Sequence, residues 1–481
     1  MNNKKINLII GIVISLCLPV IVYAAPPSKP SENGGFQGNS SASVSYKGSS
    51  TITSSVTEND KNYTSTVGGE NALLVSAGES IINNITLTKS GDESSENSDF
   101  YGTNAGVFVY NNASLTINNG NITTNGSHAN AVFSYSTGKI ILNNLNITTT
   151  ANNSGGVMVT GGGTLTANNC NVKTSGNSSA AIRSDRGGGT LSVENGTYET
   201  NGVGSPAIYS TADITVKNAT LISTKSEGVV VEGKNSVTLD TVNLTDTNNT
   251  LNGNSETYKN IFLYQSMSGD ADVGNSTFTA KNSNIETNYG DTIFVTNTTA
   301  TINLENNTFT NNDGDFLRIQ TGKWGNNGSN GGVVTMNLSN QKITGDIIVD
   351  SISTLDLNVT NKSILTTSID KENQAKNVKL SISNDSVLVL TSNTYLDSLE
   401  NENTSNSNIY SNGYKLYVGS KEITINEDTY KETNVTSNTD TSNVNNSNTL
   451  NKYIIPVVIL VVGILLFIIT NIVVRKIKKS L

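Results

Sequence analysis

Charged residues and histidine are both scarce in this chain. Lys, Arg, Asp and Glu make up 14% of its 481 residues, against about a quarter in an average soluble domain. Asn, Thr, Ser and Gly supply most of the polar surface instead. The single histidine, His128, lies in the segment GSHAN. With histidine so scarce, nucleophile triads lack their histidine base and a zinc site lacks ligands.

Basic clusters are missing from the interior of the chain. Asp and Glu number 39 against 30 Lys and Arg, and Lys or Arg residues form clusters only at the two ends. A protein that binds the phosphate backbone needs a basic patch. Nucleic acid is therefore excluded as an expected partner.

Cysteine occurs only twice, at Cys17 and Cys170. We expect Cys17 to be removed with a signal peptide, which leaves a single thiol and no internal disulfide. Stability must then come from apolar burial and hydrogen bonding.

Both ends of the chain carry an apolar run. Residues 1–24, with Lys4 and Lys5 ahead of the run, predict a signal peptide cleaved after Ala24. Residues 454–474 predict a single membrane-spanning helix, and the basic tail 475–481 is expected on the cytoplasmic side. The tail would also fit a dilysine retrieval signal in a eukaryotic host. Residues 25–41 and 427–453 are polar spacers, so the body 42–426 is expected outside the cell.

The body repeats a pattern of apolar residues about every 21 to 26 positions. The segments GGVMVTGGGTLTANNCNVKT and AAIRSDRGGGTLSVENGTYET are two copies. Each copy has an apolar residue, a second two positions later and a third five positions after that, as in Leu165/Ala167/Val172 and Leu191/Val193/Tyr198. A spacing of two is that of a strand, and the step of five must contain a corner.

An asparagine column marks this corner. Asn is suited to a sharp bend because it tolerates the left-handed backbone conformation. Three strands per coil with a fixed corner predict an all-β, right-handed parallel β-helix of about a dozen coils, closed by a cap at its C-terminal end. The column comprises Asn84, Asn119, Asn144, Asn169, Asn195, Asn218, Asn282, Asn306, Asn340, Asn361 and Asn384, with Thr241 as its exception.

The strand–Asn–strand coil resembles the right-handed parallel β-helix of the pectin-lyase-like superfamily. The order of the segments DFYGTNAGVFVYNNASLTINNG, SSAAIRSDRGGGTLSVENG and SPAIYSTADITVKN is similar to that of adhesin-like bacterial surface proteins. The resemblance implies the fold strongly and the chemistry weakly, because this scaffold carries many functions. Enzymes of the superfamily imply clustered carboxylates, either around calcium beside a basic residue or in a hydrolase site.

A line of mostly aromatic residues runs through the strand that precedes each apolar triplet. Arg183 stands in this line, and an unpaired arginine is costly in a core. We therefore expect the line to face outward as an exposed stripe that binds a ligand; the alternative is an internal aromatic stack with Arg183 as an exception. The candidate ligand-binding residues are Phe108, Tyr110, Phe133, Tyr135, Arg183, Asp185, Tyr209, Phe262 and Tyr264.

Catalytic, metal and cofactor sites are not expected. Thr160 and Thr211 stack on either side of Asp185 in the repeat register, so Asp185 has no carboxylate partner there, and we expect its pairing with Arg183 to be a surface salt bridge. Gly161–Gly163 and Gly187–Gly189 precede no helix and match no nucleotide-binding loop. The sequence favours a non-enzymatic, membrane-anchored adhesin-like protein that binds glycan or another surface. The alternative is a polysaccharide lyase or glycoside hydrolase, which would require neighbouring carboxylates on one face.

Overall fold

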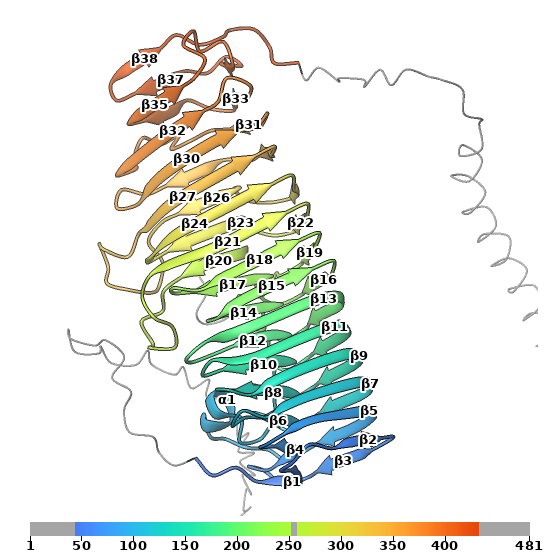
Figure 1. Cartoon of the computed structure of the whole chain (residues 1–481). Coiled ribbons are helices and arrows are strands. Elements are labelled where there is room, and N and C mark those ends of the chain that lie inside the picture. The colour runs from blue at the N-terminus through green and yellow to red at the C-terminus, as the bar shows by residue number, and fades with distance from the viewer. Residues whose placement is uncertain (1–43, 252–256, 432–481) are drawn as a thin grey trace, which may run out of the picture. The chain divides into compact units, whose positions relative to one another are not determined.

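The computed structural model describes residues 44–251 and 257–431. These residues form a right-handed-type parallel β-solenoid of about 15 turns, with a single short helix, α1 (Asn97–Tyr101) (Figure 1). The all-β class and the parallel stacking predicted from the repeat are confirmed. The predicted number of about a dozen coils is too low, because the first coils and the last ones carry little of the repeat pattern.

One face of the solenoid is a sheet of twelve parallel strands, each supplied by a different coil. It positions the candidate site, because the aromatic line lies on these strands. In spatial order they are β1 (Gly48–Ile52), β4 (Asn71–Val75), β6 (Val107–Val109), β8 (Val132–Tyr135), β10 (Val157–Thr160), β12 (Ile182–Ser184), β14 (Ile208–Ser210), β17 (Val229–Glu232), β20 (Lys259–Tyr264), β23 (Asp291–Thr296), β26 (Leu317–Ile319) and β29 (Ile347–Val349).

The apolar triplets build the second sheet. In five early coils one long strand runs through the asparagine corner: β5 (Glu79–Lys89), β7 (Ser114–Thr124), β9 (Lys139–Thr149), β11 (Gly163–Thr174) and β13 (Gly189–Thr200). In the other coils the corner divides it into shorter pieces: β2 (Thr57–Asn59), β3 (Asn62–Ser65), β15 (Asp213–Lys217), β16 (Thr220–Ser223), β18 (Ser236–Asp240), β19 (Asn243–Asp246), β21 (Asn275–Lys281), β22 (Asn284–Thr287), β24 (Thr298–Glu305), β25 (Thr308–Asn311), β27 (Gly332–Ser339), β30 (Thr354–Thr360), β32 (Asn377–Ile382) and β35 (Ser398–Asn401).

Two small sheets complete the last coils. Strands β28 (Lys342–Thr344), β31 (Ile364–Thr367), β33 (Val387–Leu390) and β36 (Ile409–Tyr410) continue the face beyond the corner. Strands β34 (Thr394–Leu396), β37 (Leu416–Val418) and β38 (Lys421–Ile423) form the other sheet, in which β38 pairs antiparallel with β37. This reversal ends the parallel stack.

The asparagine corner adopts the left-handed conformation that the sequence predicts. Every member of the column from Asn84 to Asn361 has a positive φ, between 48° and 62°, and Thr241 adopts it as well at 59°. Asn384 is absent from the residues with positive φ. Neighbouring corners are also bonded to each other, since the side-chain amide of Asn144 donates to Asn119 Oδ1 at 3.2 Å and that of Asn169 donates to Asn144 Oδ1 at 2.8 Å.

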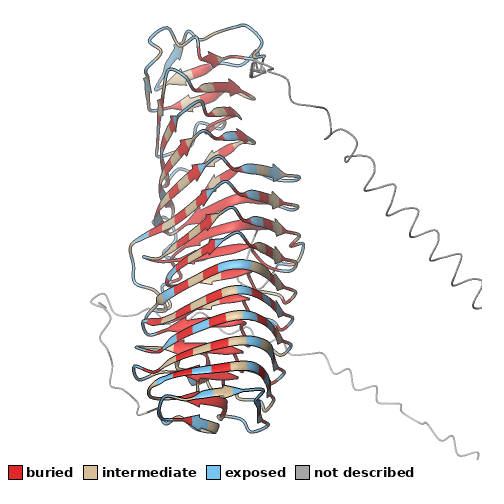
Figure 2. Cartoon of the chain, turned by 45° about the vertical axis from the view of Figure 1, so that its right-hand side comes forward, coloured by how far each residue is buried: buried red, intermediate tan, exposed pale blue. Residues whose placement is uncertain are grey.

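The core fills the space between the sheets. Alternate residues of each strand point inward and form one continuous cluster, which includes Val107 and Val109 on β6 and the triplets Leu115/Ile117/Ile122 and Leu165/Ala167/Val172. The intervening residues of the second sheet are half-buried or exposed, which gives the banded pattern of Figure 2. Cys170 is a free, buried thiol in this core.

The predicted signal peptide, membrane helix and cytoplasmic tail all lie outside the described residues, as do the whole spacer 25–41 and most of the spacer 427–453. Within residues 44–251 and 257–431, no helix has the length and apolarity needed to cross a membrane. The predictions for the two ends therefore stay predictions.

Candidate functional site

The aromatic line points outward from the solenoid, as expected, but it is not an exposed stripe. Phe108 and Phe133 pack with Leu74, Ala105 and Met158 in a cluster that is separate from the solenoid core. Both rings are fully buried, with 0% exposure. The expectation of an exposed binding face is thus wrong at these positions, because outward side chains on a sheet can be covered by another part of the chain.

Segments outside the repeat cover this first cluster. Tyr46, which precedes β1, packs against Phe108 in a tilted arrangement with ring centroids 4.7 Å apart, and the partly buried Tyr110 and Tyr135 also pack against the cluster. The insertion that carries α1 crosses the same surface. A Cβ on Gly102, at the end of α1, would lie 2.3 Å from the ring of Phe108, so only glycine allows this close approach. We name this covered group, which comprises the five buried residues and the tyrosines packed against them, the sealed cluster.

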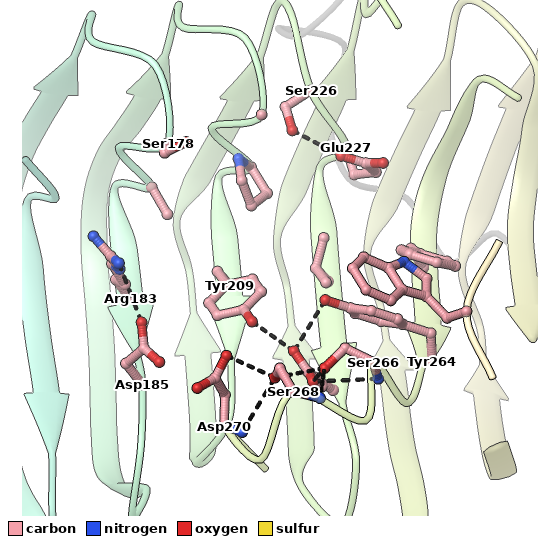
Figure 3. Close-up of a pocket in the computed structure, with 17 residues that line it drawn as sticks. Ser178, Arg183, Asp185, Tyr209, Ser226, Glu227, Tyr264, Ser266, Ser268 and Asp270 are labelled. Atoms are coloured by element: carbon pink, nitrogen blue, oxygen red, sulfur yellow. Dashed lines mark hydrogen bonds and ion pairs between the residues drawn. The ribbon is translucent and has the colours of Figure 1, made fainter. Parts of the chain in front are cut away.

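A second outward cluster lies further along the same sheet and is open on one side. Val230, Phe262, Tyr264 and Phe294 form it, with Tyr209 and Trp324 packed against it. These four side chains are only 5 to 8% exposed, so the expected exposed stripe is wrong at Phe262 and Tyr264 as well. Phe262 and Tyr264 are stacked with centroids 4.4 Å apart, and Trp324 lies 5.9 Å from Tyr264. A pocket of about 320 Å³ opens beside these rings (Figure 3). Its lining includes Arg183, Asp185, Tyr209, Glu232, Phe262, Tyr264, Ser266, Ser268, Asp270 and Trp324.

Glu232 is the acceptor around which the pocket hydroxyls are arranged. The hydroxyls of Tyr209 and Tyr264 donate to its Oε2 at 2.6 and 2.9 Å. The hydroxyl of Ser266 and its backbone N–H both donate to Oε1. The carboxyl is almost fully buried, and desolvation raises its pKa above the usual value although the three hydroxyl hydrogen bonds lower it. Because the two phenol protons are used in this way, the phenol oxygens present only lone pairs to a ligand.

Arg183 and Asp185 form a buried ion pair, so the predicted surface salt bridge is a wrong interpretation. Arg183 Nη2 donates to Asp185 Oδ2 at 3.1 Å, and Arg183 Nη1 lies 3.8 Å from Asp99 Oδ1. Asp99, on α1, accepts a hydrogen bond from His128 Nδ1 at 2.7 Å. Desolvation raises the pKa of Asp185 to about 6 against the opposing charge of Arg183, and the negative charge of Asp270 raises it further.

Carboxylates from distant coils meet at this pocket. The strands beside Asp185 keep the predicted register, since Val159 pairs with Ser184 and Arg183 pairs with Tyr209. Glu232, however, is supplied by β17, and Asp270 by the loop that joins β20 to β21. Asp270 accepts hydrogen bonds from Arg186 Nε and from the Ser268 hydroxyl, both at 2.7 Å. The expected register therefore holds, but the conclusion that Asp185 has no carboxylate near it is wrong, because Asp270 reaches the same pocket from a loop outside the repeat.

The structure divides the nine predicted ligand-binding residues between two places. Arg183, Asp185, Tyr209, Phe262 and Tyr264 line the pocket, whereas Phe108, Tyr110, Phe133 and Tyr135 belong to the sealed cluster. Trp324 and Asp99 were missed. Trp324 is the only tryptophan of the chain and lies in the loop between β26 and β27. Its occurrence in a long loop is the one feature of the sequence that could have indicated a site residue there.

Comparisons with protein families, curated proteins and solved structures found no match to this chain. In the described residues, no group of three or more His, Cys, Asp or Glu side chains is arranged to hold a metal ion. The chemistry must therefore be argued from the pocket. Its walls are aromatic, and the oxygens of Tyr209, Tyr264 and Asp270 can accept hydrogen bonds. This combination is suited to a ligand with hydroxyl or amino donors on an otherwise apolar face.

Proposed function

We propose that this chain is a non-enzymatic, adhesin-like surface protein whose solenoid binds glycan through the pocket beside Trp324. The observation that carries the proposal is the meeting of stacked aromatic rings and hydrogen-bond acceptors in one open pocket. Sugar rings have apolar C–H faces and a rim of hydroxyl donors. The faces can pack on the aromatic rings, and the hydroxyls can donate to the acceptors of the pocket. The predicted signal peptide and membrane anchor, and the resemblance to adhesin-like proteins with a pectin-lyase-like fold, support display at the cell surface.

A panel of polysaccharides tests this function. The full-length chain in detergent micelles is passed over immobilised neutral, amino and acidic polysaccharides, and retention is compared between the wild type and Trp324→Ala. We expect at least one polymer to retain the wild type and to release the variant. Tyr417→Ala is the matched control, because Tyr417 is a half-buried tyrosine stacked on Tyr395 away from the pocket lining. Equal retention of all three proteins, or of none, contradicts the proposal.

Glycoside hydrolysis is the second candidate, and one observation favours it. Asp185 is a buried carboxyl whose pKa is raised to about 6, and Asp270 lies in the same pocket. A general acid needs such a raised pKa. Against it, Glu232 is saturated by four donors and Asp270 is paired with Arg186. Release of reducing ends from the retained polymer, lost in Asp185→Asn, would establish hydrolysis in place of simple binding.

A further inference from the structure

The pocket beside Trp324 carries an excess of negative charge. Five carboxylates line it or are paired with residues that do: Asp99, Asp185, Glu227, Glu232 and Asp270. Three cations oppose them: Arg183, Arg186 and Lys259. When all are ionised, two negative charges remain among these groups. Burial raises the pKa of both Asp185 and Glu232, and the negative charge of Asp270 raises each of them further.

The arrangement of hydrogen-bond donors and acceptors also favours a positively charged ligand. The hydroxyl protons of Tyr209 and Tyr264 point to Glu232, and that of Ser268 points to Asp270. These groups consequently offer lone pairs to the pocket. Arg183, the cation in the pocket lining, is held between Asp99 and Asp185. The pocket therefore favours a ligand that donates hydrogen bonds and carries positive charge, and it repels an anion.

The aromatic walls already bind one ammonium group. Lys259 Nζ lies 4.5 Å from the centroid of Phe262 and 5.7 Å from that of Phe294. The same ring of Phe262 stacks on Tyr264, which in turn contacts Trp324. Aromatic faces attract cations most strongly where water is excluded. A second ammonium, brought by a ligand to Tyr264 and Trp324, would find the same kind of surface.

We infer that the pocket selects an amino sugar with a free ammonium group over neutral and acidic sugars. This inference rests on the proposed glycan binding and names the class of sugar. The ammonium would be held by the phenol oxygens of Tyr209 and Tyr264 and by the field of Glu232 and Asp270, while the sugar ring packs on Trp324.

Two oligosaccharides that differ by one acetyl group per residue test the inference. Binding of a glucosamine oligomer and of the matching N-acetylglucosamine oligomer to the full-length chain is measured by calorimetry at neutral pH. We expect the free amine to bind at least about tenfold more tightly. Equal or weaker binding of the amine overturns the charge selection but leaves glycan binding intact. If neither oligomer binds, the selection also fails, and the wider polysaccharide panel then decides the proposed function separately.

A pair of matched variants assigns the preference to the pocket. Asp270→Asn removes one charge from the pocket rim, where the side chain is 20% exposed and paired with Arg186. Asp356→Asn removes one charge from an exposed position on β30. We expect Asp270→Asn to reduce the amine preference severalfold and Asp356→Asn to leave it unchanged. A preference that survives Asp270→Asn, or that both variants reduce equally, contradicts the assignment.

Discussion

The sealed cluster and the pocket lie on the same outer face of the same sheet. Their residues occupy one column: Met158 of the sealed cluster pairs in register with Arg183, and Arg183 pairs with Tyr209 of the pocket. The first region is covered by Tyr46 and the α1 insertion, whereas the second is bounded by loops that leave it open. The direction in which a side chain points from its strand thus does not decide whether an aromatic ring is covered or borders a pocket. The inserted segments decide this, because they cover one cluster and leave the other open.

The largest expected effect is the loss of a sealed ring. Phe133→Ala removes a fully buried side chain and should lower the free energy of unfolding by about 3 to 5 kcal/mol. Trp324→Ala, in a half-buried loop position, should lower it by about 1 kcal/mol or less. Denaturant unfolding of both variants measures the contrast. Equal losses would show that the two clusters are the same kind of structure.

Arg183 lies at the boundary between the two regions, and its loss should lower the free energy of unfolding nearly as much as the loss of Phe133. Arg183→Met leaves Asp99 and Asp185 buried without their cation, and breaking such a buried pair costs about 3 kcal/mol or more. Adding Asp185→Asn should recover part of the loss, because one uncompensated charge is removed. A single variant as stable as the wild type in thermal unfolding would contradict the buried ion pair.

The pH dependence of stability should identify Asp185 as a carboxyl group whose pKa is raised in the folded state. Its folded pKa of about 6 lies above the value of about 4 in an unfolded chain. The folded state therefore binds the proton more tightly, and this contribution to stability is complete below about pH 4 and disappears as pH rises through about 6. We expect the melting temperatures of the wild type, relative to Asp185→Asn, to fall across this window. A constant difference would show an ordinary pKa.

The smallest effect is expected at the asparagine corner, which both regions share. Asn144 has a φ of 58°, a conformation that costs most other residues about 1 to 2 kcal/mol. Asn144→Ala should therefore destabilise the fold by about 1 to 2 kcal/mol. The backbone strain dominates, because the two amide hydrogen bonds that are lost are exposed to solvent. Asn144→Gly should be closer to the wild type, because glycine adopts this conformation freely. Chemical denaturation of the two variants distinguishes backbone strain from the amide ladder.

The fold could be predicted from the sequence because each coil repeats the same local chemistry. The triplet Leu165/Ala167/Val172 and the corner Asn169 determine two strands and a bend without reference to any distant residue. The outward direction of the aromatic line was likewise predicted, from the single charged residue Arg183. These inferences need only the register between neighbouring coils.

The site could be predicted only in part, because its remaining components come from segments outside the repeat. Tyr46 and α1 cover Phe108, and neither belongs to a coil. Asp270 is 84 residues from its partner Arg186 in the sequence, and Trp324 reaches Tyr264 from a separate loop. Loop positions have no fixed register, so the sequence pattern did not place these side chains.

Trp324 offers the most direct test of the central claim that the second region is an open binding pocket. It is the only tryptophan in the chain, so its fluorescence reports on the pocket alone. The full-length protein is titrated with the glucosamine oligomer, and quenching by acrylamide is measured at each step. The account predicts that Trp324 is quenched in the free protein and becomes protected, saturably, as the oligomer binds. Quenching that stays unchanged while calorimetry detects binding would place the ligand elsewhere and contradict the account.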